Sequence, residues 1–229
     1  MLETPMETNH EDMLKAGMHF GRKKTVFNPK MKKYVFTIKE GICIIDLFKT
    51  QIEIKTVAEY LKKSLDNNGL VLFVGITKQS GDSFKELAQS LNMPYVVERW
   101  LGGTLTNFKI ISGRVKKLEE MERQLKAGEL EKYTKKERLM FERELKKMEN
   151  RFGGLRKLVK MPDVVFVSSL KESALPVHEA KRMNIPVIAI ANTDADPNDA
   201  SHAIPANDRS KKSIDLIIES IKKELTATN

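Results

Sequence analysis

Three short, uninterrupted apolar runs constrain the fold of this chain most. They lie at residues 70–75, at 164–167 directly after Asp163, and at 186–191. None of them alternates apolar with polar residues, which is typical of strands that are covered on both faces. Helical patterns lie between the runs, and strands that alternate with helices form parallel sheets with right-handed crossovers. The sequence therefore predicts an open, doubly wound α/β fold with five parallel strands. Residues 94–97 and a short run before Asp208 supply the other two.

The helical spacing of apolar residues places the covering helices at about residues 52–65, 84–91, 174–183 and 210–225. Before them, Tyr34–Lys39 and Ile42–Leu47 are β-rich runs separated by Glu40-Gly41, a pair typical of a hairpin turn. We expect this hairpin at one edge of the parallel sheet.

Residues 106–158 contain no strand-like run. Apolar residues recur there at spacings of three and four, which gives each of two helices a narrow stripe, as in a coiled-coil seam. Thr134 and Glu137 have the spacing of a capping box that begins the second helix. We predict an antiparallel coiled-coil hairpin at 106–158, inserted into an α/β domain formed by 13–105 and 159–226. Tails at 1–12 and 227–229 complete the chain.

Composition limits the class of protein. The 229 residues include 40 Lys and Arg against 31 Asp and Glu, a net charge of +9, which favours a polyanionic partner. Cys43 is the only cysteine, so the chain has no internal disulfide and no cysteine cluster for zinc. The N-terminus resembles neither a secretory signal nor a transit peptide, and no apolar run is long enough to span a membrane. We expect a soluble, cytoplasmic protein.

The only tryptophan lies in the segment Arg99–Asn107, next to a glycine pair. Glycine permits backbone conformations and close approaches that a Cβ forbids. Thr106 or Asn107 can then cap the following helix. A core tryptophan at a strand-to-helix corner is one interpretation of this segment, and a binding corner is the other.

Six cations and no acid occur between Arg22 and Tyr34, with Phe27, Tyr34 and Phe36 among or beside them. Asn28-Pro29 disfavours a helix, so we expect an extended loop. Such a loop can follow phosphates and offer aromatic planes to unstacked bases. The alternative is a solvated loop, but cations this dense repel one another unless a counter-charge lies near.

The hairpin and its roots carry most of the positive charge. Between Lys109 and Lys160 there are 17 Lys and Arg against 9 Asp and Glu, a net charge of +8. A solvated coiled coil and a docking surface for RNA or protein both fit this count.

Catalytic motifs are missing from the sequence, including the phosphate-binding and dinucleotide-binding glycine patterns. The loop Gly75–Gly81 follows a strand end, where doubly wound folds bind ligands, but it resembles a phosphate loop only loosely. A structural metal is a further hypothesis, because four side chains could converge at the same sheet edge. These are His19, Asp194, Asp196 and Asp208.

Ten short motifs follow one another along the chain over about residues 11–225. They are Leu14-Lys15-Ala16-Gly17-Met18-His19-Phe20-Gly21, Asn28-Pro29-Lys30-Met31, Ile45-Asp46-Leu47, Phe73-Val74-Gly75, Arg99-Trp100-Leu101-Gly102-Gly103, Leu105-Thr106-Asn107, Tyr133-Thr134-Lys135-Lys136-Glu137, Pro162-Asp163, Glu179-Ala180 and Ile185-Pro186-Val187. In this order they resemble the small-subunit ribosomal protein S2 family of the bacterial type. A plastid-encoded member is the alternative source.

The resemblance implies a flavodoxin-like (Rossmann-like) α/β domain with a coiled-coil protrusion and a structural, non-catalytic role in the ribosome. It implies binding to small-subunit ribosomal RNA between head and body, contacts with neighbouring ribosomal proteins, and help in docking ribosomal protein S1. It implies no small-molecule substrate, cofactor or membrane partner. By motif match, the RNA-contact candidates are Arg22, Lys23, Lys24, Asn28, Lys30, Lys32, Lys33, Arg99, Trp100, Gly102, Gly103, Thr104 and Asn107, with Lys109, Arg114 and Lys117 at the root of the hairpin.

Two departures from the family pattern concern the possible metal. Arg22-Lys23 stands where the family often has His-Gln, and Asn192 stands where it often has an aspartate. Two other classes of function remain open at this stage. One is an α/β nucleotide-binding enzyme or regulator that uses Gly75–Gly81, and the other is a protein-docking module built on the coiled coil.

Overall fold

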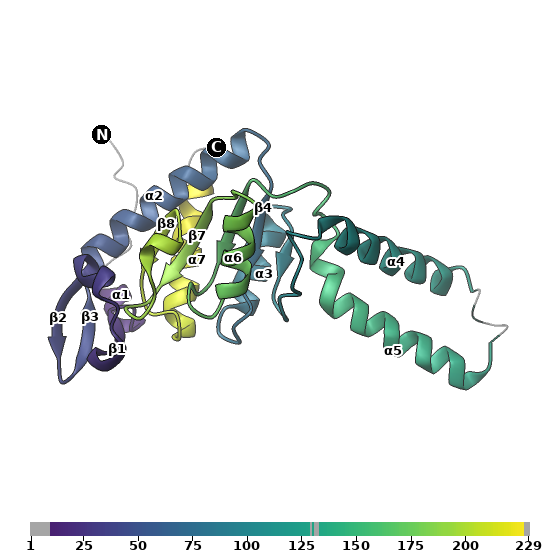
Figure 1. Cartoon of the computed structure of the whole chain (residues 1–229), viewed down its shortest axis with the longest axis horizontal. Helices are drawn as coiled ribbons and strands as arrows, with labels where there is room; N and C mark the ends of the chain where they lie inside the picture. The colour runs from purple at the N-terminus through teal and green to yellow at the C-terminus, as the bar shows by residue number, and fades with distance from the viewer. Residues whose placement is uncertain (1–9, 129, 131–132, 227–229) are drawn as a thin grey trace.

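The computed structural model describes residues 10–128, 130 and 133–226. The predicted tail at 227–229 and residues 1–9 of the predicted N-terminal tail lie outside this range. Figure 1 shows an α/β body with two long helices projecting from one end. Within the described residues, no helix is long and apolar enough to cross a bilayer.

The body is built on a parallel sheet of five strands in the order β5-β4-β6-β7-β8, which confirms the predicted architecture. All four strand pairs are parallel. The strands coincide with the apolar runs, and every residue of β4, β6 and β7 is buried. Their bounds are β4 Val71–Val74, β5 Tyr95–Val96, β6 Val164–Val167, β7 Val187–Ala191 and β8 His202–Pro205.

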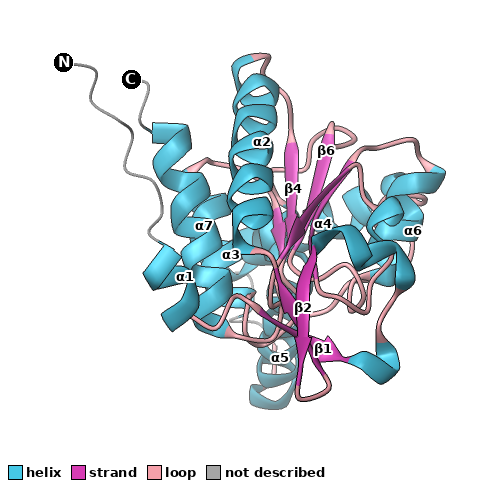
Figure 2. Cartoon of the chain, turned by 90° about the vertical axis from the view of Figure 1, so that its left-hand side faces the viewer, coloured by secondary structure: helices cyan, strands magenta, loops and turns pink. Residues whose placement is uncertain are grey.

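Helices cover both faces of this sheet, as a doubly wound fold requires. Figure 2 shows α2, α3 and α7 on one side and α6 on the other. Successive residues of a strand point to opposite faces, so Val71 and Phe73 pack under α2, α3 and α7, whereas Leu72 and Val74 belong to the second core. The helices are α1 His10–Lys15, α2 Leu47–Asp66, α3 Gly81–Ser90, α6 Ala174–Arg182 and α7 Lys211–Thr226.

The predicted hairpin forms, but its predicted place at the edge of the parallel sheet is wrong. β2 (Val35–Lys39) and β3 (Ile42–Ile45) belong to a separate antiparallel sheet in the order β1-β3-β2. The third strand, β1 (Phe20–Lys23), has only four residues, two of them cations, so it lacks the alternation that identifies a strand.

The extended loop predicted at residues 22–34 is also wrong in part. After β1 the chain makes two 3-10 turns, at Lys24–Val26 and Pro29–Tyr34. The Asn28 side chain accepts a hydrogen bond from the Lys30 N–H at 3.0 Å. Pro29 occupies the first position of the second turn, where its fixed φ suits a helical start. Asn28-Pro29 therefore starts a turn rather than keeping the chain extended.

Residues 106–158 form the predicted pair of helices, α4 (Phe108–Lys126) and α5 (Lys135–Phe152), joined to the body at one end (Figure 1). The capping box of Thr134 and Glu137 is confirmed. Ile111, Leu118 and Phe152 are among the buried side chains between the helices, and they continue one core of the body. Coiled-coil packing of the pair stays a prediction.

Candidate nucleic-acid interface

The basic N-terminal segment is anchored to the carboxyl edge of the parallel sheet. The Arg22 N–H donates to Thr193 Oγ1 at 2.8 Å, and the Asn28 N–H donates to the Thr193 carbonyl at 2.9 Å. Thr193 follows the end of β7 and is fully buried. Backbone contacts therefore hold the segment in place, so its charged side chains occupy defined positions.

Arg22 is the charged anchor of this segment. Its Nη2 donates to Asp208 Oδ1 at 3.1 Å, and its Nε lies 3.5 Å from Asp194 Oδ2. The three side chains are only 13%, 2% and 5% exposed, respectively. Ser169 and Asn192 also donate to Asp208, at 2.6 and 2.9 Å. Removing one partner of a buried ion pair is strongly destabilising. The first role of Arg22 is therefore to stabilise the fold rather than to bind a ligand.

The same geometry bears on the metal hypothesis. The guanidinium group of Arg22 lies between Asp194 and Asp208, where a cation would have to bind both. Asp196 pairs instead with Lys30 at 2.5 Å, and burial lowers the pKa of His19. Among residues 10–128, 130 and 133–226, no three His, Cys, Asp or Glu side chains are grouped to hold a metal ion. The four candidates therefore do not fit one.

The remaining cations of the segment differ in whether their side chains contact other residues. Lys30 is bound to Asp196, and this contact raises the pKa of Lys30. Lys33 lies over the Tyr34 ring, with Nζ 4.7 Å from its centre. Tyr34 is buried and Phe27 is partly buried, so Phe36 is the exposed one of the three aromatic rings predicted to be available to bases. Lysines 23, 24, 32 and 33 are exposed and make no ion pair with the described residues.

The tryptophan corner is organised by a buried carboxylate that the sequence analysis treated only as part of a motif. Glu179 of α6 is 4% exposed. Its Oε1 accepts from Trp100 Nε1 at 3.0 Å and from the Gly103 N–H at 2.8 Å. Its Oε2 accepts from the N–H groups of Leu105 and Thr106 at 3.0 and 3.3 Å. The sequence signal that could have revealed this role is that Glu179, an acidic residue, lies on the apolar face of α6.

These contacts also set the charge of Glu179. Burial by itself raises the pKa of a carboxyl group. Here the hydrogen bonds from Trp100 and from the backbone of residues 103, 105 and 106 outweigh burial, so the pKa of Glu179 is lowered. The ionised carboxylate fixes the corner. Gly103 has a φ of +90°, a backbone conformation that favours glycine over any residue with a Cβ.

The interpretation of Trp100 as a core residue is confirmed, because its side chain is buried in the same core as the inner face of α4. Asn107 occupies the predicted N-cap position but makes no side-chain cap bond. The structure leaves the following candidates exposed: Lys23, Lys24, Lys30, Lys32, Lys33, Arg99, Gly102, Asn107, Lys109, Arg114 and Lys117. It buries Trp100 and Thr104, and it partly buries Arg22, Asn28 and Gly103.

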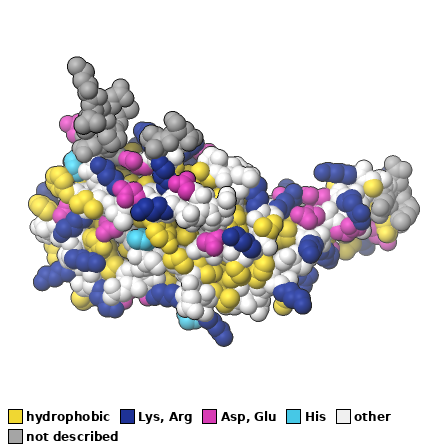
Figure 3. Space-filling view, turned by 90° about the horizontal axis from the view of Figure 1, so that it is seen from above, with side chains coloured by type: hydrophobic (Ala, Val, Ile, Leu, Met, Phe, Trp, Pro, Cys, Tyr) yellow, Lys and Arg dark blue, Asp and Glu magenta, His cyan; other side chains and the backbone are white. Residues whose placement is uncertain are grey.

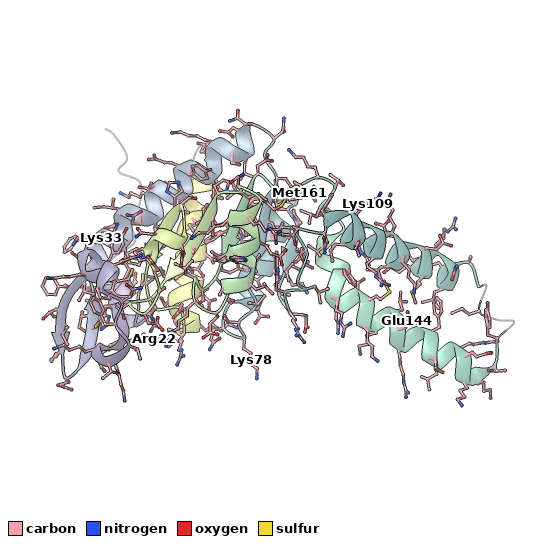
Figure 4. All side chains as sticks on the ribbon, in the orientation of Figure 1. Arg22, Lys33, Lys78, Lys109, Glu144 and Met161 are labelled. Carbon is pink, nitrogen blue, oxygen red and sulfur yellow. The ribbon has the colours of Figure 1, made fainter. Side chains whose placement is uncertain are left out.

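The candidates do not form one surface. Figure 4 places Arg22 and Lys33 at one end of the body and Lys109 at the root of the hairpin, toward the other end. Lys117 is paired across the hairpin with Glu144 at 3.3 Å, whereas Lys109 and Arg114 make no ion pair with the described residues. Two separate basic surfaces result, one on the N-terminal segment and one beginning at the hairpin root.

The Gly75–Gly81 loop is braced by hydrogen bonds of its own hydroxyl groups. Thr77 Oγ1 and Ser80 Oγ lie 2.8 Å apart, and Ser80 Oγ donates to Ser168 Oγ at 2.9 Å. A Cβ on Gly75 would lie 2.7 Å from Phe84 Cβ, so this glycine is needed for packing. The loop is a turn between β4 and α3, and its hydroxyl groups are already engaged.

The fold and these surfaces define a doubly wound α/β protein whose sheet edge carries a network of its own charged side chains. Comparison with known sequences identifies the family. The ribosomal protein S2 family matches residues 13–227, and the chain belongs to it.

Named relatives agree with this assignment. The chain is 44% identical over 210 residues to "Small ribosomal subunit protein uS2" of Bifidobacterium animalis subsp. lactis, covering 90% of this chain and 68% of the relative. It is 41% identical over 214 residues to the protein of the same name from Thermus thermophilus, covering 93% and 84%. These relatives are named as ribosomal proteins, a structural class, so the enzyme alternative is set aside.

Proposed function

We propose that this chain is a structural constituent of the small ribosomal subunit in the bacterial cytoplasm. In this role it binds small-subunit ribosomal RNA between head and body and contacts neighbouring ribosomal proteins. Membership of the ribosomal protein S2 family over residues 13–227 carries the proposal. The net charge of +9 is consistent with an RNA partner.

Lysines 23, 24, 32 and 33 are the RNA contacts that the geometry favours on the N-terminal segment. They are exposed and make no ion pair with the described residues, while Arg22 and Lys30 are engaged by aspartates. Contacts from lysine to phosphate fix position without reading sequence. Recognition would then depend on the shape of the folded RNA and on salt concentration.

Docking of ribosomal protein S1 is the second part of the proposal, and an exposed apolar patch supports it. Phe36 and Ile38 on β2 are 76% and 43% exposed, and Phe48 and Ile52 on α2 are 68% and 63% exposed. Figure 3 shows hydrophobic side chains gathered at the end of the molecule that carries these elements. Patches of this kind mark protein-interaction sites.

Rebinding to small subunits tests the RNA contacts. Lys23→Glu, Lys24→Glu, Lys32→Glu and Lys33→Glu are combined in one variant, and the purified chain is added to small subunits washed free of their own copy. We expect weaker rebinding with a loss of at most about 1 kcal/mol in stability, because the four side chains make no ion pair with the described residues and the contact of Lys33 with the Tyr34 ring is at an exposed site. Rebinding equal to that of the parent chain would remove this segment from the interface.

A further inference from the structure

The outer face of α5 carries a row of cations, with the exposed side chains of Leu139 and Met140 between the first cation and the others. Phe141, Leu145 and Phe152 pack against the core, so they define the inner face of this helix. Lys136, Arg143, Lys147 and Arg151 follow one another at spacings of seven, four and four residues, which places them on the opposite face. Lys146 lies beside them. All five are exposed.

Three of the four acids of α5 are engaged away from this row, and the fourth, Glu142, is exposed and makes no ion pair with the described residues. Glu137 is bound to Thr134 in the capping box, and Glu144 pairs with Lys117 of α4. Glu149 pairs with Arg156. The five cations of the outer face make no ion pair with any described residue, so their charge faces solvent.

The outer face of α4 is different. Toward the tip of the hairpin it carries Glu119 and Glu120, and Arg123 is paired with Glu120 at 2.7 Å. Gln124 also donates to Glu120, at 3.2 Å. Figure 3, which views the hairpin from the α4 side, shows acidic and basic side chains interspersed there. The two faces of the hairpin therefore present different electrostatic surfaces.

We infer that the hairpin binds the phosphate backbone of small-subunit RNA through the outer face of α5, an inference that rests on the proposed function. The row from Lys136 to Arg151 is about 22 Å long at 1.5 Å per residue. A polyanion with a charge at every nucleotide can meet the whole row. The exposed large apolar side chains along the row, Leu139 and Met140, lie toward the tip of the hairpin. Between Arg143 and Arg151 the exposed side chains include no large apolar residue of the kind that the centre of a protein–protein interface would need.

The test compares two variants of equal charge. One combines K136Q, R143Q and K147Q in α5. The control combines K212Q, K222Q and K223Q in α7, where the lysines are also exposed and make no ion pair with the described residues. Glutamine keeps helix propensity close to that of lysine and arginine. Rebinding of each full-length protein to depleted small subunits is measured over a range of salt concentrations, and thermal melting checks that each is folded.

We expect the α5 variant to bind about ten- to hundredfold more weakly, from three surface ionic contacts. Its slope of log affinity against log salt should fall by about 2, because each phosphate contact contributes about 0.7–0.9. The control should stay within about threefold of the parent chain. Equal losses in both variants, or no loss in the α5 variant, would overturn the inference while the proposed function stands. Failure of the parent chain to rebind would overturn both.

A crosslink identifies the partner chemically. Cys43 is fully buried, so the thiol created by R143C is the one accessible site for a photoreactive label. The label should form an adduct with ribosomal RNA that ribonuclease removes. A ribonuclease-resistant adduct with a ribosomal protein would assign the face to a protein partner and contradict the inference.

Discussion

Glu179→Gln tests whether one carboxylate organises the tryptophan corner. Oε1 accepts hydrogen bonds from two donors within the corner, and Oε2 accepts from three, one of them the Thr106 hydroxyl group. An amide keeps one oxygen acceptor and turns a donor NH₂ group toward at least two of these donors. A buried donor left without a partner costs about 1–3 kcal/mol, so two such donors predict a loss of about 2–6 kcal/mol in the free energy of unfolding.

Thermal melting measures this loss. At about 2–4 °C per kcal/mol for a chain of this size, the midpoint should fall by about 4–24 °C at pH 7. Glu98→Gln is the matched control, because Glu98 is exposed and makes no contact of this kind. Its midpoint should change by less than about 2 °C. An unchanged midpoint for Glu179→Gln would refute the assigned role of this carboxylate.

The pH dependence gives a second check on Glu179. Because its pKa is lowered in the folded state, its contribution is fully present above the unfolded pKa and is lost as pH falls through the folded pKa. The difference in stability between parent and Glu179→Gln should therefore be largest near pH 7. This difference in stability should become smaller at pH values below the usual pKa range of glutamate. A difference that is constant down to pH 3 would contradict the lowered pKa.

Three further predictions concern stability, each measured by denaturant unfolding. Arg22→Met should cost about 3–5 kcal/mol because it leaves the buried Asp208 without an ion-pair partner and leaves Asp194 with Lys171 alone, while Lys23→Met should cost less than about 0.5 kcal/mol; equal effects would contradict the buried network. Gly154→Ala should destabilise strongly, since a Cβ there would lie 2.2 Å from a backbone oxygen, whereas Gly113→Ala, with open space around it in α4, should stabilise by about 0.5–1 kcal/mol. Thr134→Ala should cost about 1 kcal/mol through loss of the capping box, and a neutral result would show that the cap contributes nothing.

The parallel sheet could be predicted because its strands are continuous apolar runs, which few other structures accommodate. The separate antiparallel sheet could not, because β1 has only four residues and pairs with β3, some twenty residues further along the chain. Its position depends on Thr193, which is distant in sequence. Local sequence patterns do not indicate contacts between residues that are so far apart in the chain.

The functional residues show the same limit. The sequence indicated that the basic segment needs counter-charge, and it separately suggested a metal at Asp194 and Asp208. Both observations have one explanation, a salt bridge between Arg22 and aspartates more than 170 positions away. A pair of acids at a sheet edge looks the same in sequence whether its partner is a metal or a guanidinium group. The role of Glu179 was hidden for a similar reason, since its donors lie on a different segment.

Sedimentation of a tagged copy in its host tests the central claim most directly. Lysate is separated on a gradient at low salt and again after a high-salt wash. A constituent of the small subunit that is held largely by phosphate contacts should migrate with small subunits in equal stoichiometry and be partly removed by salt. A chain that stays at the top of the gradient in both conditions would contradict the ribosomal assignment.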